Sequence, residues 1–399
     1  MKILVVNAGS SSLKFQLFDM DNESVIAKGN CEKIGLEGSF IGYKTKGDKK
    51  EVQVKMPDHK VAMENVFKLL TDKNEGVIKD VSEIDAVGHR FVQGGWLFSQ
   101  STLMTDKTVE LLDQVSDLSP LHAHANMAGY KGCVALMPNT PQVAVFDTSF
   151  HATMPPKAYM YGIKYEDYEQ YHVRKYGFHG TSHRYVLGQT AKILGKKPEE
   201  INIITVHLGN GSSITAIKNG QSVDTTMGLT PLEGLIMGTR SGDIDPTVVS
   251  FLGHKKNMDA DQMVNYLNKQ CGILGVSGVS SDMRELNSAI EQGNSRARLA
   301  LDMLIYRVKK YIGSYMAVLG KVDAIVFTGG IGENQEDLRE DALKDMENYG
   351  IVIDVEKNNH LPRGTVEEIS TKDSKIKVFR IPTDEELLIA RDTMSLIKK

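Results

Sequence analysis

The chain has 399 residues, of which 41% are hydrophobic and 25% charged, the composition of an ordinary globular protein. Its formal net charge of −4 argues against general attraction to nucleic acid or to an anionic membrane surface. Three scattered cysteines do not form a disulfide framework, and no segment approaches the roughly 18 apolar residues of a membrane span. We therefore expect a cytoplasmic protein with two domains.

The first predicted element is a strand, tight turn and strand over residues 2–18. An apolar run enters a turn at Asn7–Ser12, and alternating apolar and polar residues follow it. Glycine lets backbone approach a ligand, and the N–H groups, the hydroxyls and Lys14 suit phosphate oxygens. The usual strand-to-helix phosphate loop, GxxxxGK[ST], is absent from the sequence. A phosphate turn inside a hairpin indicates a different nucleotide-binding fold.

Further elements follow from the spacing of apolar residues. Val143–Phe146 reads as a buried strand with Asp147 at its end, a common place for a functional carboxylate. Apolar residues recur at three- and four-residue spacing in four segments, which we predict to be helices. They are Val61–Leu70, Thr108–Val115, Ala297–Leu319 and Asp337–Glu347.

A second strand–turn–strand, over residues 201–217, repeats the first at a distance of about 200 residues. Gly211-Ser212-Ser213 corresponds to Gly9-Ser10-Ser11, and such a distance indicates domain duplication. Asn219-Gly220 then predicts a two-residue hairpin turn.

A third glycine-rich site follows the buried strand Ala324–Thr328. We expect Asn334 to cap a helix that begins near Gln335, so that glycine backbone beside a helix N-terminus can hold a nucleotide. Each glycine-rich turn alone is weak evidence, but the three together indicate a two-lobed nucleotide cleft.

With these motifs the chain resembles the acetokinase family, within the superfamily of acetate and sugar kinases, heat-shock chaperone ATPases and actin. The resemblance covers essentially the whole chain. The tracts that carry it are Val5–Lys14, Gly88–Arg90, Phe146–His151, Tyr176–His183, His207–Ser213, Met237–Asp243, Ser281–Arg284, Thr328–Asn334 and Pro382–Glu386.

The resemblance implies an α/β fold, a duplicated ribonuclease H-like (actin-like ATPase) pair of domains, with mixed sheets flanked by helices and a cleft between them. Residues 1–150 with 385–399 would form the N-terminal domain, and 151–384 the C-terminal domain. The implied reaction is reversible transfer of the ATP γ-phosphoryl group to acetate, giving acetyl phosphate and ADP. The implied assembly is a homodimer.

The chemistry agrees with this reaction, because a carboxylate is already ionised at neutral pH and needs no general base. A site that holds two anions in line should instead be rich in cations. The resemblance assigns catalytic roles to Arg90, Asp147, His179 and Arg240. Family accounts give Asp147 an acid/base role, and orientation of an arginine is the alternative. His179 and His183 are spaced for zinc and His122-Ala-His124 lies elsewhere, but Gly180 follows His179 directly and no Glu-x-x spacing supports a zinc site.

Mg²⁺, with Mn²⁺ as a substitute, is the implied metal, held or positioned by oxygens of Asn7 and Glu385. The implied ATP site takes residues from the three glycine-rich turns and one further tract. They are Ser10, Ser12, Lys14, His207, Leu208, Gly209, Asn210, Gly211, Asp282, Met283, Arg284, Gly330, Ile331, Gly332, Glu333 and Asn334.

The implied acyl pocket consists of Val92, Leu121, Phe178 and Pro231, beside Arg90, which grips the carboxylate or the moving phosphoryl group. Gln93 departs from the family, which usually carries histidine there, and a glutamine does not titrate. Because one methylene changes binding by roughly 1–3 kcal/mol, we expect propionate to be a poorer substrate that is still accepted.

Two alternatives compete with an acetate-specific enzyme. Propionate kinases share nearly every motif, and a butyrate-specific enzyme fits the tracts less well. A non-catalytic actin-like or chaperone ATPase would need the phosphate turns but has no use for Arg90, His179 and Arg240 converging on a small anion.

Overall fold

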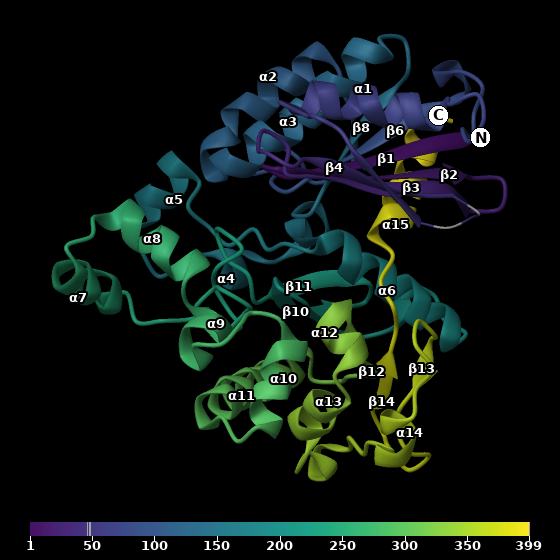
Figure 1. The fold of residues 1–399 in the computed structure, drawn as a ribbon. Helices are drawn as coiled ribbons and strands as arrows, with labels where there is room; N and C mark the ends of the chain where they lie inside the picture. The colour runs from purple at the N-terminus through teal and green to yellow at the C-terminus, as the bar shows by residue number, and fades with distance from the viewer. Residues whose placement is uncertain (46, 48, 399) are drawn as a thin grey trace. The chain divides into compact units, whose positions relative to one another are not determined.

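The computed structural model in Figure 1 describes residues 1–398 apart from positions 46 and 48. It divides into two compact units. Unit 1 comprises Met1–Phe150 and Asp384–Lys399, and unit 2 comprises His151–Thr383. In each unit helices flank a mixed β-sheet, so the predicted α/β class is confirmed.

Unit 1 contains a sheet with the strand order β5-β4-β3-β2-β1-β6-β8-β7. β1 pairs antiparallel with β2 and parallel with β6, and β6 pairs parallel with β8. The strands are β1 (Lys2–Ala8), β2 (Ser12–Asp19), β3 (Ser24–Glu32), β4 (Phe40–Lys44), β5 (Lys49–Gln53), β6 (Ala86–Phe91), β7 (Thr102–Leu103) and β8 (Gln142–Phe146).

Helices cover the two faces of this sheet. α1 (His59–Leu70), capped by the Asp58 carboxylate, and α3 (Pro120–Leu136) pack together in the apolar core of one face. α15 (Glu385–Ile397) packs on β6, β1 and β8. A side chain at Gly88 would collide with Thr393 and Ile389 of α15, so this close packing requires glycine. α2 (Asp106–Gln114) completes the α-helices of the unit among the described residues.

Unit 2 has the strand order β11-β10-β9-β12-β14-β13. The central strand β9 is buried on both faces and pairs antiparallel with β10 and parallel with β12. The strands are β9 (Ile203–Leu208), β10 (Ser212–Lys218), β11 (Gln221–Thr225), β12 (Ala324–Thr328), β13 (Glu367–Glu368) and β14 (Lys377–Arg380).

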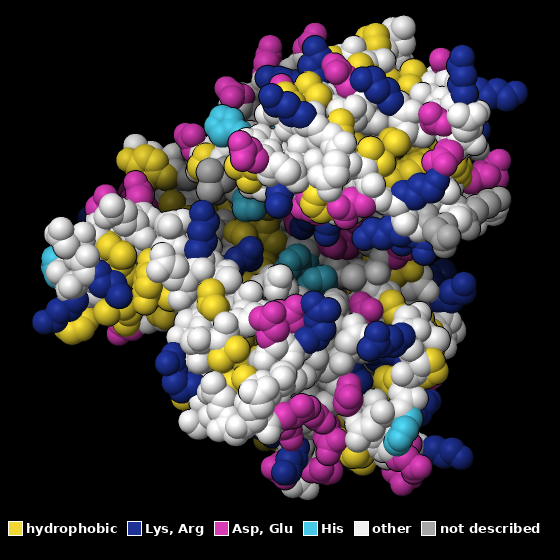
Figure 2. All heavy atoms as spheres, viewed as in Figure 1, with side chains coloured by type: hydrophobic (Ala, Val, Ile, Leu, Met, Phe, Trp, Pro, Cys, Tyr) yellow, Lys and Arg dark blue, Asp and Glu magenta, His cyan; other side chains and the backbone are white. Residues whose placement is uncertain are grey.

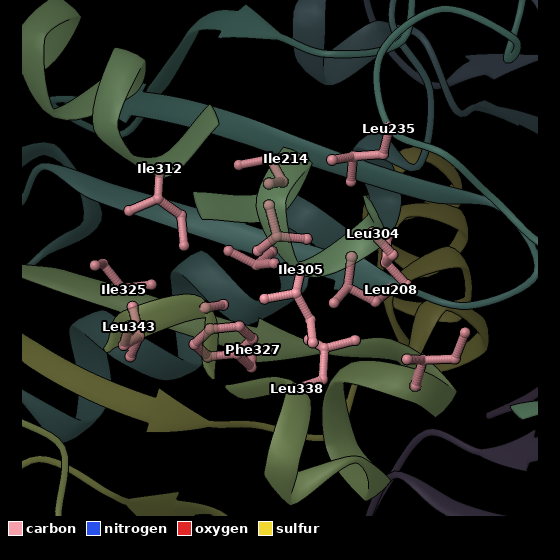
Figure 3. Packing of buried hydrophobic residues seen from close by; sticks show 14 of the residues in the cluster. Leu208, Ile214, Leu235, Leu304, Ile305, Ile312, Ile325, Phe327, Leu338 and Leu343 are labelled. Carbon is pink, nitrogen blue, oxygen red and sulfur yellow. The ribbon is translucent and has the colours of Figure 1, made fainter. Parts of the chain in front are cut away.

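The main apolar core of unit 2 lies between this sheet and α11 (Ser295–Leu319), as Figure 3 shows. α6 (Gly180–Ile193) packs on β9 and β12. The other helices are α4 (Pro156–Tyr159), α5 (Tyr165–Tyr171), α7 (Thr247–Lys256), α8 (Ala260–Lys269), α9 (Gly272–Ser277), α10 (Met283–Glu291), α12 (Gly329–Asn334), α13 (Glu336–Leu343) and α14 (Val355–Asn359).

The two sheets share one strand order around their first strands. In unit 1 it is β3-β2-β1-β6-β8 and in unit 2 β11-β10-β9-β12-β14, with the same parallel and antiparallel senses. The internal echo in the sequence therefore has a structural counterpart. The matching positions differ from those expected, however, because Gly9 opens its turn directly after β1, whereas Gly211 ends the turn before β10. Gly209, directly after β9, corresponds to Gly9.

The predicted Asn219-Gly220 turn is confirmed, since both residues have positive φ and Lys218 pairs with Gln221. The predicted helix cap at Asn334 is wrong. The glycine run itself forms α12, Asn334 ends that helix, and its side-chain Nδ2 donates to the Gly330 carbonyl. The helix predicted to reach Glu347 ends at Leu343, where α13 stops.

Acidic and basic side chains intermingle on the face shown in Figure 2, as the small net charge suggests. Within the described residues, none of the helices has both the length and the apolar character needed to cross a bilayer.

Candidate functional site

In unit 1, Arg90 and Asp147 stand at the ends of the adjacent parallel strands β6 and β8. Arg90 Nε donates to Asp147 Oδ1 at 2.9 Å and Nη2 donates to Oδ2 at 2.6 Å. The Asp147 side chain is buried, and its backbone N–H also donates to the Phe91 carbonyl. Burial alone would lower the Arg90 pKa, but the carboxylate outweighs it and raises that pKa, so the guanidinium stays charged.

The turn between β1 and β2 is closed by a hydrogen bond from Gly9 N–H to the Ser12 carbonyl. Ser10 is exposed, Ser12 is half-buried, and Lys14 is exposed opposite Asn7 in the β1–β2 ladder. These groups lie together on one hairpin, as the sequence predicts. Their arrangement leaves hydroxyls and an ammonium group accessible to an anion.

Asn126 of α3, which sequence reasoning missed, connects this turn to β6. Its Nδ2 donates to the Ala8 carbonyl at 2.9 Å, and its Oδ1 accepts from Val92 N–H at 3.0 Å. Asn126 is buried, so both bonds are shielded from water. It thereby fixes the backbone beside Arg90 relative to the β1–β2 turn.

Glu385, the first residue of α15, has a buried Oε1 atom without a hydrogen-bond partner among the described residues. Burial raises the pKa of Glu385 to about 7, and Arg90 opposes that shift only in part. A buried, unpaired carboxylate oxygen suits a hard cation such as Mg²⁺, which prefers oxygen ligands. Half-buried Asn7 of β1 offers a second oxygen. The residues present in unit 1 therefore fit the implied metal.

The predicted acyl-pocket residues have different environments. Val92 and Phe178 are buried, Pro231 is half-buried, and the side chain of Leu121 lies outside the described residues. Beside Val92, the Gln93 Oε1 accepts from Gly95 N–H, while its buried Nε2 has no partner in the described part of the chain.

In unit 2, His179 and Arg240 meet beside the glycine turn that follows β9. An added Cβ at Gly211 would lie 3.3 Å from both His179 Nε2 and Arg240 Nη1. Arg240 Nη1 also donates to the Pro231 carbonyl at 2.9 Å, which fixes the guanidinium. Burial lowers the Arg240 pKa, but arginine remains charged in proteins. An imidazole and a guanidinium thus border one glycine.

His179 is the N-cap of α6 and has a left-handed backbone with φ of 56°. Its ring stacks on that of His207, with 4.3 Å between the centroids. His179 Nδ1 lies 2.9 Å from the Ser213 hydroxyl, which also lies 2.7 Å from His183 Nε2. His207 Nδ1 pairs with the Ser182 hydroxyl. A network of imidazoles and hydroxyls therefore supports the ring of His179.

The predicted nucleotide tracts of unit 2 converge on one cavity of about 630 Å³. Eight predicted residues line it: Gly209, Asn210, Asp282, Met283, Arg284, Gly330, Ile331 and Asn334.

Five other predicted ATP residues of unit 2 do not line this cavity. His207 and Gly211 lie with His179, the Leu208 side chain is in the core, Gly332 is buried, and Glu333 accepts from Thr383 N–H. Arg284 forms a two-point ion pair with Asp282, which lowers the Asp282 pKa to about 2.

The cavity also contains three residues that sequence reasoning missed, namely Ser281, Gln335 and Arg363. Ser281 lies within a tract that carries the family resemblance and Gln335 adjoins another, so their positions could have been inferred. Arg363 comes from a loop after α14 with no recognisable pattern. Its place in the cavity follows only from the fold.

Known proteins match this chain over essentially its full length. The acetokinase family model matches residues 2–391. Acetate kinases of Finegoldia magna and Halothermothrix orenii are 56% and 52% identical, with complete coverage of both chains in each case.

Two solved structures are also similar over 99% of both chains. Acetate kinase of Porphyromonas gingivalis has 48% identity and a TM-score of 0.95. A propionate kinase of Francisella tularensis has 41% identity and a TM-score of 0.92. The chain belongs to the acetokinase family.

Proposed function

We propose that this chain catalyses the reversible, Mg²⁺-dependent transfer of the ATP γ-phosphoryl group to acetate, giving acetyl phosphate and ADP. An acetate oxygen forms the new bond to phosphorus as the bond between phosphorus and the ADP oxygen breaks. Full-length identity of 52–56% to acetate kinases favours acetate over propionate as the preferred acid.

The observation that carries the proposal is the pairing of His179 and Arg240 at Gly211. Gly211 belongs to the same β9–β10 turn as Gly209 and Asn210, which line the cavity formed by the nucleotide tracts. A cavity of about 630 Å³ accommodates a nucleoside, and Gly209 and Asn210 lie on its phosphate side in this proposal. A guanidinium and an imidazole beside it suit charge that develops on equatorial phosphoryl oxygens.

Arg90 supplies the acid-binding part of the proposal. Its two-point bond to Asp147 occupies Nε and Nη2, which leaves Nη1 for an acetate or phosphoryl oxygen. Asp147 acts in this proposal as a positioning residue, because an ionised acetate has no proton to give up. Buried Val92 is adjacent in sequence to the strand that carries Arg90 and suits a methyl group.

Mg²⁺ would be held by oxygens of Asn7 and Glu385, and it would neutralise charge on the ATP phosphates. Ser10, Ser12 and Lys14 would contact phosphate oxygens from the β1–β2 turn. A homodimer and a cytoplasmic location belong to the same proposal, and sedimentation analysis tests the first of them.

The test is an acyl-phosphate assay with ATP and Mg²⁺ and with acetate, propionate or butyrate, in which hydroxylamine traps the product. We expect most hydroxamate from acetate, less from propionate and little from butyrate. Absence of hydroxamate with every acid would reject the proposed reaction. Faster turnover of propionate would reject acetate as the preferred substrate.

A further inference from the structure

Behind His179 lies a chain of polar side chains drawn from three elements of unit 2. The distance between Thr205 Oγ1 on β9 and His183 Nδ1 on α6 is 2.6 Å. His183 Nε2 lies 2.7 Å from Ser213 Oγ on β10. Ser213 Oγ in turn lies 2.9 Å from His179 Nδ1. Thr205, His183 and Ser213 are all fully buried, so each bond forms away from water.

The direction of these hydrogen bonds follows from how many protons each group carries. His183 is neutral at physiological pH, because burial lowers its pKa and the nearby His151 and His207 rings lower it further. A neutral imidazole has one N–H donor and one acceptor nitrogen. Its two nitrogens therefore play opposite roles toward Thr205 and Ser213.

Thr205 decides between the two possible directions. Its buried hydroxyl has one hydrogen-bond partner among the described residues, His183 Nδ1. If Nδ1 were the donor, the Thr205 hydrogen would have no acceptor, which is costly in a buried site. Thr205 therefore donates to Nδ1, and His183 carries its own proton on Nε2 and donates to Ser213 Oγ.

The Ser213 hydroxyl accepts from His183 and donates to His179, so the hydrogen bonds keep one direction along the chain of side chains. Its oxygen accepts from His183 Nε2, and its hydrogen has His179 Nδ1 as acceptor. A neutral His179 that accepts at Nδ1 carries its proton on Nε2. That nitrogen is the one that borders Gly211 together with Arg240 Nη1.

We infer that Thr205, His183 and Ser213 form a relay of hydroxyl, imidazole and hydroxyl that holds neutral His179 in the tautomer protonated at Nε2. The purpose of the relay rests on the proposed function. In that reaction, His179 would present an N–H donor at Nε2, not a lone pair, to the phosphoryl group. Thr205, His183 and Ser213 are positioning residues, and none of them needs to contact substrate.

The test compares Thr205→Val, which keeps the shape but removes the hydroxyl, with Thr205→Ser, which keeps the hydroxyl. Nitrogen-15 NMR of histidine side chains reads the tautomer of His179 directly. We expect a proton on Nε2 in the wild type and in Thr205→Ser. In Thr205→Val, and in Ser213→Ala, we expect a mixture of the two tautomers.

Turnover provides the second readout. Loss of one hydrogen bond that orders the relay should lower kcat by about 2- to 10-fold in Thr205→Val, with KM for ATP nearly unchanged. Thr205→Ser should restore kcat, and thermal unfolding should show that both variants fold. A His179 proton on Nδ1 in the wild type, or an unchanged tautomer in both Thr205→Val and Ser213→Ala, would overturn the relay. The NMR result does not depend on acetate turnover, so failure of the proposed reaction remains distinguishable.

Discussion

Asp147 holds Arg90 by two parallel hydrogen bonds, and it does so from a fully buried position at the end of β8. An arginine held in this way has lost most of its rotational freedom before substrate binds. Pre-orientation of this kind lowers the entropic cost of catalysis. In the proposed reaction, the carboxylate therefore contributes through the position of its partner.

Asp147→Asn should lower kcat by about 10- to 100-fold, because a neutral amide cannot hold both guanidinium nitrogens and small misplacements are costly. The pH dependence of kcat should keep its shape, since no proton transfer is removed. Steady-state acyl-phosphate assays between about pH 6 and 9 measure both the fall in kcat and the shape of its pH dependence. Loss of one limb of the pH profile would show that Asp147 exchanges a proton.

Gly211→Ala should reduce turnover by about tenfold. Its Cβ would lie 3.3 Å from both Arg240 Nη1 and His179 Nε2, so each group must shift by a few tenths of an ångström. Gly188→Ala on α6 is the matched control, because a Cβ there meets nothing within 4 Å. The control should keep full activity. Equal activity of the two variants would contradict the placement of Arg240 and His179 at this turn.

Val92→Ala should shift selectivity toward the longer acid. Val92 is buried, and Asn126 fixes its backbone N–H, so the shortened side chain should leave space that the chain does not refill. The ratio of kcat/KM for propionate to that for acetate should rise by about tenfold, the usual effect of one methylene. The hydroxamate assay with both acids measures this ratio. An unchanged ratio would remove Val92 from the acyl pocket.

Glu385→Gln should raise the Mg²⁺ concentration needed for half-maximal activity by about tenfold or more. The amide keeps the size of the side chain but removes the charge of the buried oxygen that now lacks a partner. Titration of Mg²⁺ at saturating ATP and acetate measures the effect. Glu386→Gln, one residue along α15, is the comparison, and an equal response in both variants would count against a specific role for Glu385.

His89 should make unit 1 sensitive to acid. It is fully buried, bonded through Nε2 to the Gln142 side chain, and burial lowers its pKa from 6.5 to about 4. The unfolded chain therefore binds a proton at higher pH than the folded one, and stability falls as pH drops from about 6.5 to about 4. The loss attributable to His89 is up to about 3 kcal/mol.

The matched variant for this effect is His89→Gln, which keeps a donor for Gln142 but does not titrate. Urea unfolding of wild type and variant at pH 7.5 and 5 (about 1 unit above and about 1.5 units below the ordinary histidine pKa) gives the comparison. The difference between the two pH values should shrink in the variant. His183 contributes in the same direction and should leave a residual difference in both proteins.

Local patterns in the sequence predict much of this fold. The hairpin at residues 2–18, the turn at Asn219-Gly220 and the buried strand before Asp147 all follow from residue type and spacing, because those features depend on neighbours in the chain. The prediction of a turn in the glycine run after β12 is wrong, although glycine is a poor helix former. There tertiary packing prevails, and Gly329 approaches the Leu208 backbone so closely that a Cβ would collide.

In the candidate site too, some features follow from the local sequence and others only from the fold. Residues within recognisable tracts, such as Arg90 and Arg240, could be named from the sequence. The hydrogen bonds made by Pro231, Asn126 and Ser213 could not be predicted, because each joins residues that only the fold brings together. Pro231 and Ser213 stand among the predicted residues and tracts, but their partners do not follow from the sequence. Thr205 looks like an ordinary strand residue, and its hydrogen bond to His183 follows only from the fold.

Unit 1 is built from two separate segments of the chain, Met1–Phe150 and Asp384–Lys399, and this affects how it folds during synthesis. The sheet of this unit is complete by residue 146, yet the helix that packs on β1, β6 and β8 is α15, which begins at residue 385. During translation, residues 1–150 therefore keep one apolar face uncovered while the contiguous residues 151–383 emerge and fold. A ribosome stalled before Glu385 should display a nascent polypeptide with a native second unit and a first unit that binds chaperones.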